Sequence, residues 1–212
     1  MKLYTYFRSS AAFRVRIALN LKGLKPEQVF VHLRKNEQGS APYRGINPQG
    51  LVPTLEHDGR SFGQSLAIAE YLDEIVPEPP LLPARAAERA RVRQLADIVA
   101  CDIHPLGNLR VLRYLRDRMG QNEEAVADWQ RHWIALGLEA FEDLVAGSSD
   151  TGRFCHKDKP TLADIFLIPQ LANARRAQLD LAPFPTLLRI EETALALPAF
   201  ADALPKNQPD AE

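Results

Sequence analysis

Two adjacent serines, Ser9 and Ser10, stand where the sequence pattern changes from a strand to a helix. Residues 2–6 alternate apolar and polar side chains as a strand does, and from Phe13 an apolar spacing of four predicts a helix. A helix N-terminus offers unpaired N–H groups and the positive end of a dipole, which stabilise a bound anion. The simpler alternative is that one of the serines only caps the helix.

The chain continues from this junction as Arg8-Ser9-Ser10-x-x-x-Arg14-Val15-Arg16-Ile17-Ala18-Leu19. This run resembles the signature of zeta-class glutathione transferases, the family that contains maleylacetoacetate and maleylpyruvate isomerases. The resemblance implies that Ser9, with Ser10 beside it, holds the sulfur of glutathione as a thiolate. Ala11 stands where many members have a cysteine. Because the family's nucleophile is the sulfur of glutathione, this change is expected to modify the site without removing its chemistry.

A proline interrupts the next predicted strand, residues 51–56. Proline cannot donate a ladder hydrogen bond, so Pro53 by itself argues for an edge strand or a bend. The resemblance instead implies a cis bond between Val52 and Pro53. The backbone of Val52 would then face outward and pair with the cysteine of glutathione like an added strand.

Gln64 and Ser65 stand at the start of the following predicted helix. Ser65 is expected to cap this helix. The resemblance implies that the pair also binds the γ-glutamyl carboxylate of glutathione, which suits a helix N-terminus. It further assigns a polar contact with glutathione to Gln38, in the loop after the second strand.

A second group of candidates lies around Pro105, on a predicted long helix from residue 84 to 118 with a kink at that proline. The resemblance implies that His104, Asn108 and Arg110 line the site for glutathione and substrate. Taken alone, a histidine on a helix is more often core or surface, and a run of arginines is more often a solvated face.

A maleyl substrate carries two carboxylates beside a cis double bond. The family mechanism adds the glutathione thiolate to that bond, allows rotation, and expels the thiolate to leave the trans isomer. Cationic side chains must hold the carboxylates. Arg8 and either Arg175 or Arg176 are the candidates, and Arg176 matches the family's carboxylate-binding arginine.

The 212 residues have a formal net charge of −1, so the overall field does not favour nucleic acid or an anionic membrane. Cys101 and Cys155 form no metal-ligand or dithiol pattern, which favours a reduced, cytoplasmic setting and no metal site. No apolar run approaches the length of a membrane span, and the N-terminus has no leader pattern. These features predict a cytoplasmic protein with a small-molecule partner.

Strand and helix patterns alternate over residues 1–80 in the order β-α-β and then β-β-α, which is the arrangement of an α/β thioredoxin-like, glutathione-binding domain. Four prolines within residues 76–83 indicate a stiff linker. From residue 84 to 212 the patterns predict an all-α, substrate-binding domain. Together they give the architecture of a glutathione transferase, for which the resemblance implies a homodimer.

Three features of the helical domain are predicted from pattern. Thr161 and Asp164 form a capping-box pattern at the start of a helix. Residues 205–212 are expected to fray. One helix has an apolar stripe made of the following residues: Val126, Trp129, Trp133, Leu136, Ala140 and Leu144.

The sequence predicts a glutathione-dependent cis-trans isomerase of a maleyl keto acid in aromatic amino-acid (tyrosine) or aromatic-compound degradation. Maleylacetoacetate and maleylpyruvate stay open as substrates, because both carry the same maleyl head. One alternative is a general glutathione transferase or a haloacid-processing enzyme. Another is a non-catalytic binding module that uses the same fold.

Overall fold

The computed structural model describes all 212 residues and divides into two compact units. The first unit contains Met1–Leu81 together with Leu195–Glu212, and the second contains Leu82–Ala194. The sequence analysis placed the whole C-terminal part of the chain in the helical domain. Its last segment instead packs with the first unit, because side chains of the N-terminal helix bind its backbone.

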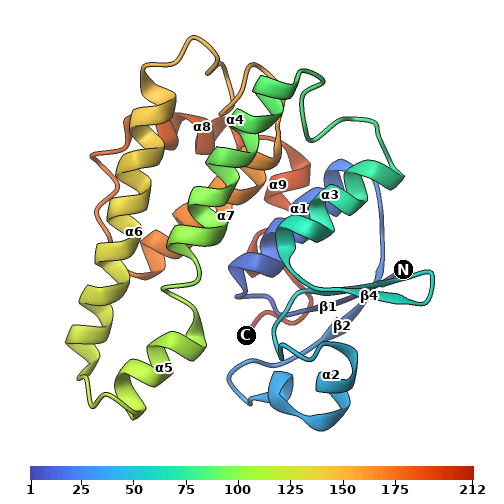
Figure 1. The fold of residues 1–212 in the computed structure, drawn as a ribbon, viewed down its shortest axis with the longest axis vertical. Helices are drawn as coiled ribbons and strands as arrows, with labels where there is room; N and C mark the ends of the chain where they lie inside the picture. Colours follow the sequence, from blue (N-terminus) through green and yellow to red (C-terminus); the bar gives the residue numbers. More distant parts are fainter. The chain divides into compact units, whose positions relative to one another are not determined.

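The first unit is built on a four-stranded mixed sheet with the strand order β2-β1-β3-β4. Strand β1 is parallel to β2 and antiparallel to β3, which is antiparallel to β4. The elements are β1 (Lys2–Thr5), α1 (Ser10–Leu21), β2 (Glu27–Phe30), the 3₁₀ turn η1 (Glu37–Gly39), α2 (Ala41–Ile46), β3 (Thr54–His57), β4 (Arg60–Phe62) and α3 (Ser65–Ile75). The predicted thioredoxin-like arrangement is confirmed. Helices α1 and α3 lie on one side of the sheet and α2 on the other (Figure 1).

Helix α1 is the central helix of this unit. Its apolar residues Phe13 and Ile17 are almost completely buried, and it packs along α3, where Ile68 and Leu72 are buried. Burial of such side chains stabilises the fold by about 1.5–3 kcal/mol each. This packing fixes the position of the α1 N-terminus relative to that of α3, and both ends carry candidate site residues.

The linker after α3 is held by a buried ion pair. The ammonium of Lys22 lies 2.6 Å from a carboxylate oxygen of Asp73 and 2.5 Å from the carbonyl oxygen of Pro79. The same oxygen of Asp73 accepts a hydrogen bond from the backbone N–H of Leu81. The proline-rich segment is therefore tied back to α1 and α3.

The second unit is helical. Its elements are α4 (Ala86–Asp97), the π-helical segment η2 (Ile98–Ile103), α5 (Leu109–Asp117), α6 (Glu123–Ala146), α7 (Leu162–Arg176) and α8 (Pro185–Leu195) up to Ala194. The prediction of one long helix kinked at Pro105 was wrong. The helix ends in the π-helical turn, and Asn108 caps a new helix, because a proline removes a backbone donor at this point.

The buried stripe of α6 differs from the predicted one by about one residue. Leu136 and Leu144 are exposed, whereas Ile134, Leu138 and Phe141 are buried. Both sets repeat every three or four residues, so the pattern alone could not choose between neighbouring stripes. Helix α6 packs on α5 and η2, which sets the register.

The start of α7 is the predicted capping box. The carboxylate of Asp164 is fully buried and accepts hydrogen bonds from the backbone N–H and the hydroxyl of Thr161. It also accepts one from the backbone N–H of Cys155, at 2.8 Å. Burial raises the pKa of Asp164, and these hydrogen bonds act in the opposite direction.

Fraying was predicted for residues 205–212, but these residues are held in a C-terminal segment, residues 195–212, that packs on the first unit. This segment contains α9 (Pro198–Ala201) and the 3₁₀ turn η3 (Pro205–Asn207), and α9 packs against α1. The side chain of Gln208 is buried and donates to two backbone carbonyls of the segment. In Figure 1 this segment (red) runs back beside the N-terminal elements.

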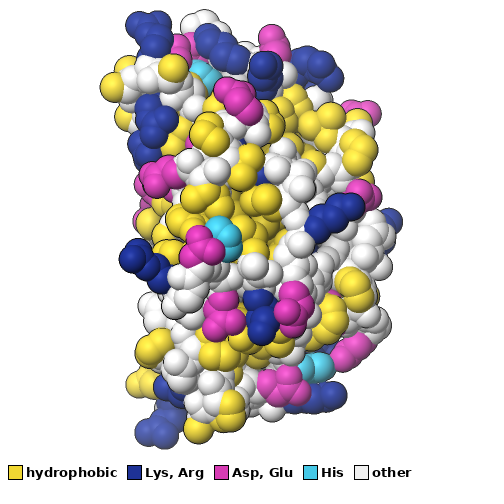
Figure 2. All heavy atoms as spheres, turned by 90° about the vertical axis from the view of Figure 1, so that its right-hand side faces the viewer, with side chains coloured by type: hydrophobic (Ala, Val, Ile, Leu, Met, Phe, Trp, Pro, Cys, Tyr) yellow, Lys and Arg dark blue, Asp and Glu magenta, His cyan; other side chains and the backbone are white.

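The molecular surface mixes charges of both signs. On the face in Figure 2, Lys and Arg side chains are interspersed with Asp and Glu, in keeping with the net charge of −1. No helix is long and apolar enough to cross a membrane.

Candidate active site

The serine turn, residues 6–9 between β1 and α1, places Ser9 at the N-cap of the helix. The Ser9 hydroxyl oxygen accepts a hydrogen bond from the backbone N–H of Ala12, at 3.1 Å, and the N–H of Ser9 donates to the carbonyl oxygen of Tyr6. A hydroxyl that accepts through its oxygen keeps its own hydrogen to donate. The capping role and the proposed role toward sulfur are therefore compatible in one side chain.

The second candidate element is the loop before β3, where the bond between Val52 and Pro53 is cis, as the resemblance implied. The carbonyl oxygen of Leu51 accepts hydrogen bonds from the hydroxyl of Tyr43, at 2.6 Å, and from the side-chain amide of Asn47, at 2.9 Å. These buried polar side chains hold the loop. The backbone of Val52 has no backbone hydrogen-bond partner within the chain, so an extended peptide can pair with it.

The third element is the N-terminus of α3, where the prediction that Ser65 is the cap was wrong. The N-cap is Gln64, with a φ of 66°, and Ser65 is the first helical residue. A non-glycine residue in the left-handed region is strained, and such strain is concentrated at ligand sites. The side-chain amide of Gln64 donates to that of Gln49, and the guanidinium of buried Arg14 donates to the Ser65 hydroxyl oxygen at 3.2 Å.

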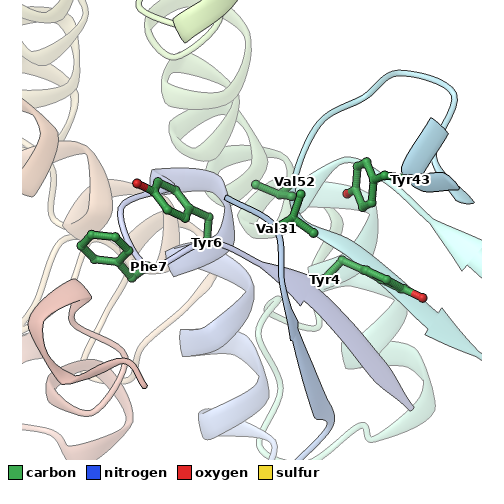
Figure 3. Packing of buried hydrophobic residues seen from close by; sticks show 6 residues of the cluster. All are labelled: Tyr4, Tyr6, Phe7, Val31, Tyr43 and Val52. Carbon is green, nitrogen blue, oxygen red and sulfur yellow. The ribbon is translucent and has the colours of Figure 1, made fainter. Parts of the chain in front are cut away.

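The core of the first unit brings these three elements together. Tyr6 and Phe7, from the serine turn, belong to the same buried cluster as Val52 and Tyr43 (Figure 3). Arg14 links α1 to the start of α3. The serine turn and the loop with Val52 therefore share one buried cluster, and a hydrogen bond connects α1 to the N-terminus of α3.

Gln38 lies in η1, and its side-chain amide donates to the side chain of Asn36. Its amide oxygen is buried without a hydrogen-bond partner. Arg8 lies in the serine turn and is partly buried. Ser10 is the first residue of α1 and is buried.

Sequence reasoning missed the residues that support this site. Arg14 and Arg16 lie in the run that carries the family resemblance but received no role from it, and Tyr43, Asn47 and Gln49 show no motif. The supporting residues are Arg14, Arg16, Tyr43, Asn47 and Gln49.

In the second unit, the structure gives Asn108 a capping role. Its side-chain oxygen accepts from the backbone N–H of Arg110, at the start of α5. The side chain of Arg110 is exposed, and His104 follows the π-helical segment. These three residues therefore lie within one turn that joins η2 to α5.

Arg175 and Arg176, at the end of α7, have different partners in the structure. The guanidinium of Arg175 forms a two-pronged ion pair with Glu191, whose side chain is largely buried. Arg176 donates to the side-chain oxygen of Asn173, at 2.6 Å. The ion pair thus uses two donors of Arg175 for structure.

The two cysteines lie in different surroundings, Cys101 exposed and Cys155 buried. Cys155 is buried, which raises the pKa of its thiol, and neither cysteine forms a disulfide. No group of three or more His, Cys, Asp or Glu side chains is placed to hold a metal ion.

Comparison with known proteins identifies the protein class as glutathione transferase. Residues 3–80 match the family of the glutathione S-transferase N-terminal domain. The chain superimposes on the holo structure of a maleylpyruvate isomerase, described as a bacterial glutathione S-transferase of the zeta class, with a TM-score of 0.98, 47% identity and full coverage of both chains.

Relatives of similar length then define the family. The maleylpyruvate isomerase of Ralstonia sp is 47% identical over 210 residues, which cover 99% of both proteins. The maleylacetoacetate isomerase of Rattus norvegicus is 44% identical, over 98% of this chain and 94% of the relative. The structure of a maleylacetoacetate isomerase from Methylobacterium, with bound malonate and glutathione, aligns over 100% of this chain and 100% of its own, with a TM-score of 0.97 and 44% identity. The chain belongs to the zeta-class glutathione transferases, the maleylacetoacetate and maleylpyruvate isomerase family.

Proposed function

We propose that this protein is a glutathione-dependent cis-trans isomerase that converts a maleyl keto acid into its fumaryl isomer. The observation that carries the proposal is the Ser9 hydroxyl at the N-cap of α1, whose oxygen already accepts from Ala12. This arrangement provides a donor at a positive helix end, as a thiolate requires.

The residues present fit glutathione. The unpaired backbone of Val52 suits the extended peptide of its cysteine, and the strained Gln64 at the start of α3 suits a carboxylate. When bound, glutathione supplies the thiol sulfur that adds to the double bond and leaves again. Glutathione is therefore required but not consumed.

In this proposal, different side chains bind the thiolate, the rest of glutathione and the substrate carboxylates. Ser9 and Ser10 stabilise the sulfur anion at the helix N-terminus, and Gln38, Gln64 and Ser65 orient the cofactor. Arg8 and Arg176 bind the substrate carboxylates, and a fixed cation also stabilises the negative charge that develops during the reaction. On the family resemblance, the proposal also assigns His104, Asn108 and Arg110 to glutathione binding.

The assay that tests the function uses the two maleyl keto acids with catalytic glutathione. We expect the cis substrate to disappear without loss of free glutathione, because the thiolate that adds must leave. Rapid conjugation of a neutral electrophile, with both maleyl compounds left untouched, would instead identify a general transferase. No turnover of any electrophile, despite retention on immobilised glutathione, would identify a binding module.

We predict that Arg176→Gln raises the KM for the diacid by about five- to tenfold, with a much smaller change in the glutathione requirement. A cation that holds a carboxylate serves ground state and transition state alike, so its loss acts mainly on KM. The size corresponds to about 1–1.4 kcal/mol, which lies in the range for the net loss of one hydrogen bond that water partly replaces.

The neighbouring Arg175→Gln is the matched control for this prediction. Because Arg175 pairs with Glu191, its loss should lower thermal stability and leave the KM for the diacid near the wild-type value. A larger KM effect from Arg175→Gln than from Arg176→Gln would reverse the assignment.

Two further properties belong to the proposal. We place the protein in the cytoplasm, which is supported by two cysteines that form no disulfide. We also propose a homodimer, which the family resemblance supports and which sedimentation equilibrium would test.

A further inference from the structure

The C-terminal segment binds the turn that carries Ser9. The backbone N–H of Phe7, in the middle of this turn, donates to a carboxylate oxygen of Asp210 at 2.9 Å. The two residues are 203 positions apart in the sequence. The contact joins the end of the chain to the turn that presents the proposed sulfur-binding hydroxyl.

Arg16 holds the same turn from α1. Its buried guanidinium donates to the carbonyl oxygens of Tyr6 and Phe7, at 3.4 and 3.2 Å. It also donates twice to the carbonyl oxygen of Ala203, at 3.1 and 3.2 Å, in the C-terminal segment. One cation therefore fixes the turn and the segment to each other.

The charges of this arrangement are complementary. Burial lowers the pKa of Arg16 to about 10, and the nearby charge of Asp210 acts against that shift. The Arg16 guanidinium stays charged at neutral pH and donates to the carbonyl oxygens of the turn, while the Asp210 carboxylate oxygen accepts from the N–H of Phe7. The contacts thus use backbone donors and acceptors that the sheet and the helix leave unpaired.

We infer that Asp210 is a positioning residue for the glutathione thiolate, and that Arg16 works with it by holding the C-terminal segment against the Tyr6–Ser9 turn. The turn is closed by the hydrogen bond from the N–H of Ser9 to the carbonyl oxygen of Tyr6, at 3.0 Å. An unfixed turn would let the Ser9 hydroxyl move away from the sulfur, and a donor must be fixed to stabilise a charge efficiently. This inference rests on the proposed function and extends it to the C-terminal segment.

The test compares Asp210→Ala, Asp210→Asn and wild-type protein. Asp210→Ala should raise the pKa of bound glutathione and lower kcat about three- to tenfold, the range for one hydrogen bond. Asp210→Asn keeps an oxygen acceptor for Phe7, so it should recover most of this loss. The matched control is Glu212→Ala, which removes an acidic side chain of the same segment that contacts His32 instead.

Amide hydrogen exchange provides a readout that needs no glutathione. Exchange at the Phe7 amide should become about tenfold faster in Asp210→Ala and stay near the wild-type rate in Glu212→Ala. Unchanged exchange in Asp210→Ala would overturn the inference, and so would faster exchange with an unchanged glutathione pKa and kcat. A wild-type protein that binds no glutathione would reject the proposed function, and the exchange comparison alone would then show whether Asp210 fixes the turn.

Discussion

Replacing Ser9 by alanine is expected to raise the pKa of bound glutathione by about one to two units and to lower kcat by about ten- to a hundredfold. The hydroxyl is the donor that lies at the N-cap of α1. A hydrogen bond to a charged group contributes roughly 1.5–3 kcal/mol, and this free energy corresponds both to the expected pKa shift and to the expected fall in kcat. Binding of glutathione should weaken much less, because the neutral thiol gains little from this donor.

The variant also removes a helix cap, so its effect on stability needs a control. Loss of the hydrogen bond from Ala12 to Ser9 is expected to cost about 1 kcal/mol of stability. Ser40→Ala removes an equivalent serine cap, at α2, where the hydroxyl accepts from the N–H of Tyr43. It should lower stability by a similar amount and leave the pKa of glutathione unchanged.

Ultraviolet absorbance of the thiolate, measured against pH in the binary complex, gives the pKa directly. The same titration of Ser10→Ala and of the double variant shows whether the second serine shares the task. A wild-type absorbance profile in both single variants and in the double variant would contradict the assignment of the thiolate site to these serines.

The fold was predictable because its signals are local. The alternation of residues 2–6 and the four-residue spacing from Phe13 each describe one element, and their order leaves few topologies. The short helix α2 was missed, since its six residues Ala41–Ile46 are too few to show a period. Fold and family agreed with the comparisons because the Arg8 to Leu19 run is long and specific.

What the sequence could not show were contacts between distant residues. Nothing in the pattern around Arg16 indicates that it binds the carbonyl of Ala203, and the polar tail near Asp210 resembles a frayed end. The choice between Arg175 and Arg176 likewise depends on where Glu191 lies in the folded chain. Such contacts are set by packing and have no period in the sequence.

Replacing Asp164 by alanine is expected to lower the free energy of unfolding by about 1.5–5 kcal/mol, because the carboxylate does more than cap α7. The capping box alone accounts for about 0.5–2 kcal/mol. The variant also leaves the buried N–H of Cys155 without its acceptor, which costs a further 1–3 kcal/mol or so. For a chain of this length the melting temperature should fall by about 3–20 °C.

The same loop offers a matched control for this variant. Asp158 also accepts a hydrogen bond from a backbone N–H, that of Arg153, but it is exposed to solvent. Asp158→Ala should change the melting temperature by only a few degrees, because water can replace the lost acceptor. Thermal denaturation of both variants, with kcat measured on the folded fraction, separates stability from catalysis. If Asp164→Ala melted like the wild type and yet lost most of its turnover, Asp164 would belong to the active site, because a purely structural carboxylate acts on kcat only through the folded fraction.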